Sequence, residues 1–131
     1  MTHHIYIPGE PRPWKRTGGN GKRRYTDPEM AELKRTIGVI ARTKFSQPIQ
    51  QGVAVSMECC FYVQPPKRLD LIKRPYPTRR PDLDNMEKLV ADALNGIAYH
   101  DDCQIVDSHT RKVWAINEEP HTSVYVRELT Y

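Results

Sequence analysis

One apolar stripe constrains this chain more than any other feature of its sequence. Apolar residues recur at i, i+3, i+4, i+7, i+8 and i+11, in the order Met86, Leu89, Val90, Ala93, Leu94 and Ile97. That spacing places them on one face of an α-helix. Asp84 and Glu87 have the spacing of a capping box, and Asn95-Gly96 offers the left-handed residue at which helices end. The sequence therefore predicts a helix from about Asn85 to Asn95.

Acidic residues gather at both ends of this predicted helix. The stretch from residue 79 to 104 contains five aspartates and one glutamate. Asp82 and Asp84 lie two residues apart before the helix, so an extended backbone points both carboxylates to one side. Asp101 and Asp102 follow the helix after a short link. We therefore expect the two acidic pairs to converge.

Converging carboxylates suggest a magnesium site that cuts nucleic acid. Magnesium takes oxygen ligands and binds through one or two carboxylates together with water and substrate phosphate. Lys88 then supplies a fixed positive charge near the developing phosphorane. A plainer interpretation stays open, because Asp82 and Asp84 also suit a helix start and paired aspartates such as Asp101 and Asp102 are common in loops.

Basic residues concentrate in two segments that contain twelve of the twenty Lys and Arg residues. The first, Pro11 to Tyr25, holds Arg12, Lys15, Arg16, Lys22, Arg23 and Arg24. The second, Pro65 to Pro81, is rich in proline and holds Lys67, Arg68, Lys73, Arg74, Arg79 and Arg80. Such segments suit contact with the phosphates of DNA. A solvated charged loop remains the alternative for the first segment.

Length, charge and cysteine content narrow the class of protein. A chain of 131 residues suits one domain, and a net charge of +4 with a pI near 9.0 favours a polyanionic partner. No apolar run is long enough for a signal peptide or a membrane helix. Three cysteines without metal-binding spacing argue against a disulfide framework and against zinc, and favour the cytosol.

The rest of the chain predicts the other elements of a mixed α/β (α+β) fold. A short strand at Ile5–Ile7 precedes a helix that is capped by Thr26 or Asp27. The apolar face of that helix is formed by Met30, Leu33, Ile37, Ile40 and Ala41. Strands are expected at Val53–Val63, Gln104–Trp114 and His121–Glu128, the last antiparallel to its predecessor. The order is β-α-β-α-β-β in a single domain, residues 1–131, with a small mixed sheet and two helices.

Alternation along the Gln104–Trp114 strand assigns its side chains to two faces. Lys112 shares a parity with Gln104 and Asp102, whereas Ile105 and His109 point to the opposite face. The roles of His109 and of His100 beside the aspartates stay open.

With these residues in view, the chain resembles the RusA family of Holliday-junction resolvases, which are common in phages and prophages. The likeness covers nearly the whole chain. It is carried by Arg80-Pro-Asp82-Leu-Asp84-Asn85-Met-Glu-Lys88, Asp92-Ala-Leu-Asn-Gly96, Asp101-Asp102-Cys-Gln104-Ile-Val and Lys112, together with Ile7-Pro-Gly-Glu-Pro, Lys15-Arg16 and Tyr25-Thr26 near the start.

The resemblance implies a homodimeric, Mg²⁺-dependent enzyme, with Mn²⁺ as a substitute, that resolves four-way DNA junctions by symmetric paired nicks in recombination and repair. It implies that Asp82, Asp84 and Asp102 bind the metal and that Lys88 assists catalysis. The expected DNA contacts are Lys15, Arg16, Arg23, Arg24, Lys67, Arg68, Lys73, Arg74, Arg79, Arg80 and Lys112. A nuclease for other branched DNA and a non-catalytic DNA-binding protein remain the alternatives.

Overall fold

The structure is a computed structural model that describes residues 2–13 and 27–130. It contains four strands and two α-helices in these residues: β1 (Thr2–Pro8), α1 (Pro28–Arg42), β2 (Val55–Val63), α2 (Leu83–Ala93), β3 (Ile105–Trp114) and β4 (His121–Glu128). A short 3-10 helix, Asp102–Gln104, lies immediately before β3. The predicted order and the mixed fold class are therefore confirmed.

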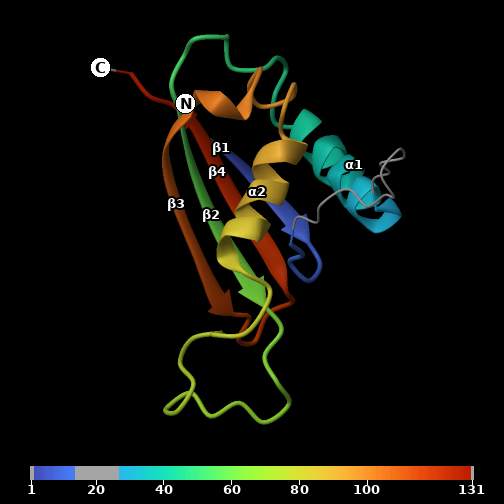
Figure 1. Ribbon diagram of the computed structural model, residues 1–131, viewed down its shortest axis with the longest axis vertical. Coiled ribbons are helices and arrows are strands. Elements are labelled where there is room, and N and C mark those ends of the chain that lie inside the picture. The colour runs from blue at the N-terminus through green and yellow to red at the C-terminus, as the bar shows by residue number, and fades with distance from the viewer. Residues whose placement is uncertain (1, 14–26, 131) are drawn as a thin grey trace, which may run out of the picture.

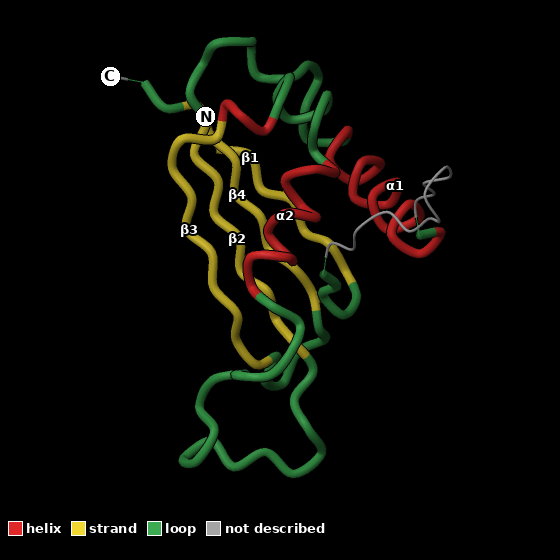
Figure 2. Tube along the Cα trace, in the orientation of Figure 1, coloured by secondary structure: helices red, strands yellow, loops and turns green. Residues whose placement is uncertain are grey.

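The strands form one sheet in the order β1-β4-β2-β3. β2 runs parallel to β3, whereas β4 is antiparallel to both of its neighbours, β1 and β2. The predicted direction of β4 relative to β3 is thus correct, although β2 lies between them. Both helices cover the same face of the sheet, and the opposite face carries no helix from the described residues (Figures 1 and 2).

The core lies between this sheet and the two helices. The predicted stripe of α2 is buried there, with Met86, Leu89 and Val90 each at most 2% exposed. The alternating residues of β2 from Val55 to Val63 face the same core. The apolar face of α2 is therefore used inside the chain and is not left for a partner.

The start of α2 differs from the prediction. Asp82, not Asp84, is the N-cap residue, and Asp84 lies in the first turn. The proposed capping box of Asp84 with Glu87 is wrong, because Asp84 lies inside the helix and not at its N-cap. The Glu87 carboxylate instead accepts a hydrogen bond from the Ser108 hydroxyl on β3. The predicted left-handed residue after the helix is confirmed at Gly96, whose φ is 79°.

The cap of α1 confirms one of two predicted residues. The Asp27 carboxylate accepts hydrogen bonds from the backbone N–H groups of Glu29 and Met30 at 2.8 and 3.4 Å. Thr26 lies outside the described residues.

A bulge at Val106 makes the side chains of β3 face differently from the prediction. Val55 of β2 pairs with Ile105, but the next residue, Ser56, pairs with Asp107. One residue is thereby inserted, and the alternation of side chains changes phase. Ile105 packs against the core, whereas His109 lines the helix-free face, so the predicted common face of these two residues is wrong.

Candidate functional site

The first acidic pair lies where the loop after β2 meets α2. Asp82 and Asp84 are both exposed to solvent. Asp84 accepts a hydrogen bond from the backbone N–H of Asn85 at 3.0 Å. A hollow of about 450 Å³ opens beside Asp82 and is also lined by Arg12, Arg80 and Asn85. This end of α2 therefore combines accessible carboxylates with two guanidinium groups.

The second acidic pair lies beyond the opposite end of α2, and Asn95 holds it in place. The Asn95 side chain accepts from the Asp102 N–H at 2.8 Å and donates to the carboxylates of Asp102 and Asp92 at 3.4 Å each. Burial raises the pKa of the Asp102 carboxyl, and the charges of Asp101 and Asp92 raise it further. Sequence reasoning gave Asn95 only the role of a helix end.

Asp101 has a structural task in the same turn. Its carboxylate caps the 3-10 helix by accepting from the Cys103 N–H, and this hydrogen bond lowers the pKa of Asp101. The pKa values of the neighbouring carboxyls of Asp101 and Asp102 are thus shifted in opposite directions by their surroundings.

Gln104 fixes the turn to the rest of the molecule, which sequence reasoning missed. Its side-chain oxygen accepts from the backbone N–H groups of His100 and Asp101 at 2.9 and 3.1 Å. Its side-chain nitrogen donates to the carbonyls of Gln50 and Val53 at 2.9 and 3.0 Å. Gln104 is 8% exposed, so this amide is both buried and fully paired. The sequence predicted Gln104 only as the first residue of a strand, and nothing in that pattern indicates a buried side chain with four hydrogen bonds.

Tyr99 ties the link after α2 back onto the helix. Its ring is fully buried, its hydroxyl donates to the Ala91 carbonyl at 2.6 Å, and burial raises the pKa of the phenol. The turn that carries Asp102 is therefore held by two buried polar side chains.

The two acidic pairs do not converge within one chain. Pro81 is fixed near the far end of β3, because its carbonyl accepts from Lys112 Nζ at 2.8 Å, whereas Asp102 directly precedes Ile105. The 11 residues of α2 span about 16 Å. The strand from Ile105 to Lys112 spans about 23 Å. The expected meeting of Asp82 and Asp84 with Asp102 is therefore wrong for the single chain.

The donor set of one chain does not match the predicted metal site. Among residues 2–13 and 27–130, no group of three or more His, Cys, Asp or Glu side chains could hold a metal ion. Lys112 also lies far from Asp102, because it binds the Pro81 carbonyl at the other end of α2. The common face that parity predicted for Lys112 and Asp102 therefore does not bring the two residues together.

The remaining acids and bases near α2 have separate positions. Lys88 is an exposed residue one turn after Asp84. Asp92 forms an ion pair with Lys34 of α1, with Nζ and Oδ2 2.6 Å apart. His100 is exposed, and His109 Nε2 lies 3.4 Å from the Asp107 carboxylate.

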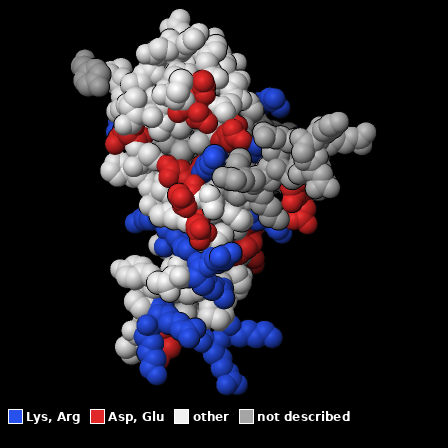
Figure 3. All heavy atoms as spheres, viewed as in Figure 1, with Lys and Arg blue, Asp and Glu red and all other residues white. Residues whose placement is uncertain are grey.

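The β2–α2 loop, residues 64–82, extends away from the body of the molecule at the Asp82 end of α2 (Figure 1). Basic side chains gather on it, while acidic side chains are spread over the region above it (Figure 3). Five predicted DNA contacts are exposed here: Lys67, Arg68, Lys73, Arg74 and Arg80. Apolar side chains are exposed among them, and Ile72 reaches 94%.

Two predicted DNA contacts hold this loop in place. Arg79 donates to the Gln64 carbonyl at 2.8 Å, and its guanidinium lies 5.2 Å from the centre of the Trp114 ring. Lys112 Nζ donates to the carbonyls of Arg79 and Pro81 at 2.7 and 2.8 Å. Arg79 and Lys112 therefore have structural roles beside any contact with DNA. Lys15, Arg16, Arg23 and Arg24 lie outside the described residues.

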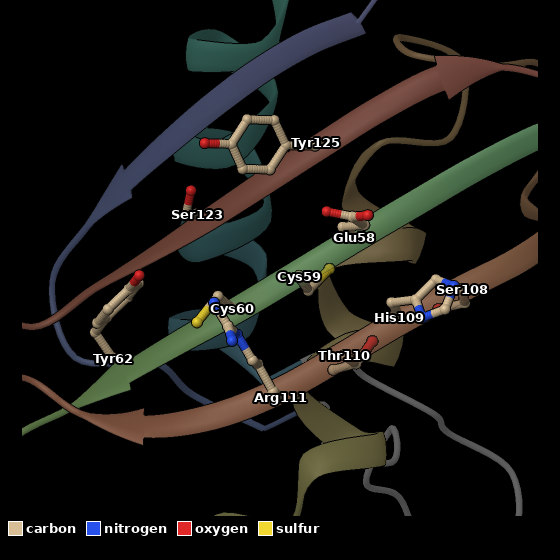
Figure 4. A pocket seen from close by; sticks show the side chains of 10 residues that line it. All are labelled: Glu58, Cys59, Cys60, Tyr62, Ser108, His109, Thr110, Arg111, Ser123 and Tyr125. Atoms are coloured by element: carbon tan, nitrogen blue, oxygen red, sulfur yellow. The ribbon is translucent and has the colours of Figure 1, made fainter.

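A different hollow, of 740 Å³, lies on the helix-free face of the sheet. Figure 4 shows His109 and Arg111 of β3 on this face, beside Glu58 and Cys60 of β2. The aspartates at the ends of α2 are on the other side of the sheet, so this hollow does not belong to the acidic site.

The comparisons with known proteins agree with the sequence resemblance. Residues 7–127 match the family model "Endodeoxyribonuclease RusA". The chain is 34% identical over 135 residues to "Uncharacterized protein YqaN" of Bacillus subtilis (strain 168), and the match covers 93% of each chain. No helix in the described part of the chain is long and apolar enough to cross a membrane. Since the family match extends over nearly all of the sequence, this chain belongs to the RusA endodeoxyribonuclease family.

Proposed function

We propose that this protein is a structure-selective endodeoxyribonuclease that resolves four-way DNA junctions by paired nicks, and that it works as a homodimer with a divalent metal in the cytoplasm. Membership of the RusA family supports the nuclease activity and a branched DNA substrate. The metal, Mg²⁺ or its substitute Mn²⁺, enters the proposal through the family resemblance. The described residues of one chain do not bring together the ligand set that the resemblance implies.

The observation that carries the proposal is the position of Asp82. Its carboxylate lines the hollow that also contains Arg12 and Arg80, and it directly follows the basic β2–α2 loop. Guanidinium groups bind phosphate oxygens through paired N–H donors. A DNA backbone held by the loop therefore passes within reach of Asp82 and Asp84.

The exposed tip of the loop suits the centre of a junction better than intact duplex. Ile72 is 94% and Leu71 is 52% exposed, with the cation of Lys73 next in sequence. Proteins that deform DNA insert such apolar side chains between base steps while basic neighbours bind phosphate. Base steps at a branch point are already weakened, which favours this contact there.

The position of Lys88 supports the role in catalysis that the family resemblance implies for it. Lys88 is exposed near the middle of α2, one helical turn beyond Asp84. A fixed positive charge there stabilises the charge that develops on a phosphate during cleavage.

A non-catalytic DNA-binding protein is the second candidate. The distance between the acidic pairs of one chain favours it, because carboxylates that never meet serve only as caps and as local charge.

A nicking assay separates the two candidates. The substrates are a synthetic four-way junction and a linear duplex of the same arm sequence, each with Mg²⁺ or with EDTA. We expect wild-type protein to nick the junction symmetrically in Mg²⁺ only, and Asp82→Asn to bind without nicking. Glu58→Gln, which removes an exposed acid on the helix-free face, is the matched control and should nick like wild type.

Each alternative result has a defined meaning. Equal nicking by wild type and Asp82→Asn removes Asp82 from the mechanism. Junction binding without nicking by either protein favours the binding-only candidate, and equal nicking of the duplex removes the structural selectivity.

A further inference from the structure

The starting point is that the Asp82 carboxylate is not used by the helix that it begins. An aspartate at the N-cap normally accepts hydrogen bonds from backbone N–H groups of the first turn. Asp27 does so at the start of α1. Asp82 is the N-cap residue of α2, yet its side chain forms no cap hydrogen bond and is exposed to solvent. The helix therefore leaves the Asp82 carboxylate available for other contacts, but it does not orient this side chain.

We infer that Lys112 of β3 is the positioning residue of Asp82, because it holds the backbone that enters α2 so that the carboxylate faces the hollow beside Arg80. The inference rests on the proposed nuclease function. It adds to that function a residue that acts through Asp82 and not on the DNA itself.

The first support is the pair of hydrogen bonds that Lys112 donates. Its Nζ lies 2.7 Å from the Arg79 carbonyl oxygen and 2.8 Å from the Pro81 carbonyl oxygen. Arg80 lies between these two residues, and Asp82 directly follows Pro81. Because a peptide group is planar, a fixed Pro81 carbonyl also fixes the direction of the Asp82 N–Cα bond. One ammonium group thus sets the orientation of the backbone on which the Asp82 side chain stands.

The second support is that the ammonium group of Lys112 is turned toward the protein. Lysine side chains usually keep their charge in water, and the loop lysines Lys67 and Lys73 do so. Lys112 is half-buried instead, with both carbonyls as acceptors. Hydrogen bonds from a charged donor are roughly twice as strong as those between neutral groups. The end of the β2–α2 loop is therefore held firmly to β3.

The third support is that the same side of β3 also holds the first turns of α2. Ser108 lies four residues before Lys112, and its hydroxyl donates to the Glu87 carboxylate. Lys112 therefore binds the backbone before Asp82, and Ser108 binds the helix after it. In Figure 1 the loop rejoins α2 beside the end of β3. Since β3 is paired with β2 along its length, the start of α2 takes its position from the sheet.

The chemical consequence concerns the rate of cleavage more than the binding of DNA. A displacement of about 1 Å in a reacting group can lower a rate on the order of 10²-fold. Without Lys112, the backbone from residue 79 to 82 can rotate, and the Asp82 carboxylate then samples directions away from the hollow. The exposed cations of the β2–α2 loop still bind phosphate in that state. Loss of Lys112 should therefore lower kcat and leave KM nearly unchanged.

The test compares two substitutions on neighbouring residues of β3. Lys112→Met keeps the aliphatic stem and removes the donors, whereas Arg111→Met changes an exposed cation on the helix-free face. On a synthetic four-way junction with Mg²⁺, we expect Lys112→Met to lower kcat by roughly 10- to 100-fold and to change KM by less than about threefold. Arg111→Met should nick like wild type. Lys112→Arg, which keeps charged donors, should recover part of the lost rate.

The salt dependence of junction binding separates positioning from direct contact with DNA. If Lys112 binds phosphate, Lys112→Met raises KM and lowers the slope of log K against log salt by about 0.9. That result with kcat unchanged overturns the inference. Nicking by Lys112→Met at the wild-type rate overturns it as well.

Hydrogen exchange followed by mass spectrometry tests the same contact without relying on activity. In Lys112→Met the amides of residues 82–86 should exchange faster than in wild type, because the backbone before them is released. The amides of residues 95–104, at the other end of α2, should exchange at the wild-type rate and serve as the internal control.

Each other exchange result has a defined meaning. Unchanged exchange at residues 82–86 overturns the inference. Faster exchange over the whole chain also overturns it, in favour of a general loss of stability. If wild type nicks no junction, the proposed function fails, and exchange at residues 82–86 alone decides whether Lys112 holds this segment.

Discussion

At the scale of single residues, the turn that carries Asp102 depends on polar side chains turned inward. Gln104 forms four hydrogen bonds, and Asn95 contacts both the backbone and the carboxylate of Asp102. Buried polar groups of this kind add little to the free energy of unfolding when they are hydrogen-bonded, but a buried group that loses its partner destabilises the fold. The turn that carries Asp102 is therefore held in one conformation.

Gln104→Leu should destabilise the fold by about 2–4 kcal/mol, because it removes hydrogen bonds to two backbone N–H groups and to the carbonyls of Gln50 and Val53, of which Gln50 keeps the Val53 N–H. Urea unfolding followed by circular dichroism measures the change. Gln51→Leu, at an exposed position nearby, should change stability by less than about 0.5 kcal/mol. An equal effect of both substitutions contradicts the anchoring role.

Asp102→Asn should stabilise the folded protein at neutral pH. The folded state raises the pKa of Asp102, so the unfolded state binds fewer protons near that pKa and the ionised carboxylate opposes folding. The gain should be present above the raised folded pKa and vanish below the ordinary Asp value of about 3.9. Melting temperatures of both proteins between pH 3 and pH 7, without divalent metal, test this sign. A gain that grows as the pH falls would contradict it.

At the scale of elements, the β2–α2 loop divides its cations between support and contact. Arg79 is bound to the Gln64 carbonyl and stacked over Trp114, and Lys112 binds two carbonyls at the end of the loop. Trp114 itself donates to the Arg74 carbonyl at 3.0 Å. These contacts fix the base of the loop, while its remaining cations extend into solvent.

Arg80→Ala and Arg79→Ala should therefore weaken junction binding in different ways. Loss of Arg80 removes one phosphate contact and lowers the slope of log K against log salt by about 0.9. Loss of Arg79 also frees the loop, so limited proteolysis between residues 64 and 82 should become faster. Fluorescence anisotropy at several salt concentrations measures the slopes. An unchanged slope for Arg80→Ala means that its guanidinium does not touch phosphate.

At the scale of the whole molecule, the sheet separates two surfaces. The helices, the basic loop and the acidic pairs belong to one side, whereas the hollow around His109 and Arg111 lies on the other. β3 forms the margin between them.

Dilution should reduce the nicking rate per chain if the protein works as the proposed homodimer. Below the dissociation constant of the dimer, the rate should fall with the square of the chain concentration, because two chains must associate before the active dimer exists. Initial rates over a wide range of enzyme concentrations on saturating junction measure this order. A rate per chain that stays constant while sedimentation shows monomers would contradict the proposed homodimer.

The sequence by itself determined the elements and the family. Periodicity located both helices and the strands, because burial of one face imposes a repeat that each segment carries locally. The motif that contains Asp82, Asp84, Lys88 and Asp102 identified the family, because its residues keep fixed spacings along the chain and can be read from the sequence. Two small exceptions are Asp82 rather than Asp84 as N-cap, and the bulge at Val106 in the pairing of β3 with β2.

Only the tertiary structure decided how these residues stand in space. It showed that Asp82 and Asp102 lie at opposite ends of α2, that β2 separates β3 from β4, and that Arg79 and Lys112 support a loop. Such relations depend on which elements pack together and in which direction. Residues far apart in sequence decide that jointly, so no local pattern reveals it.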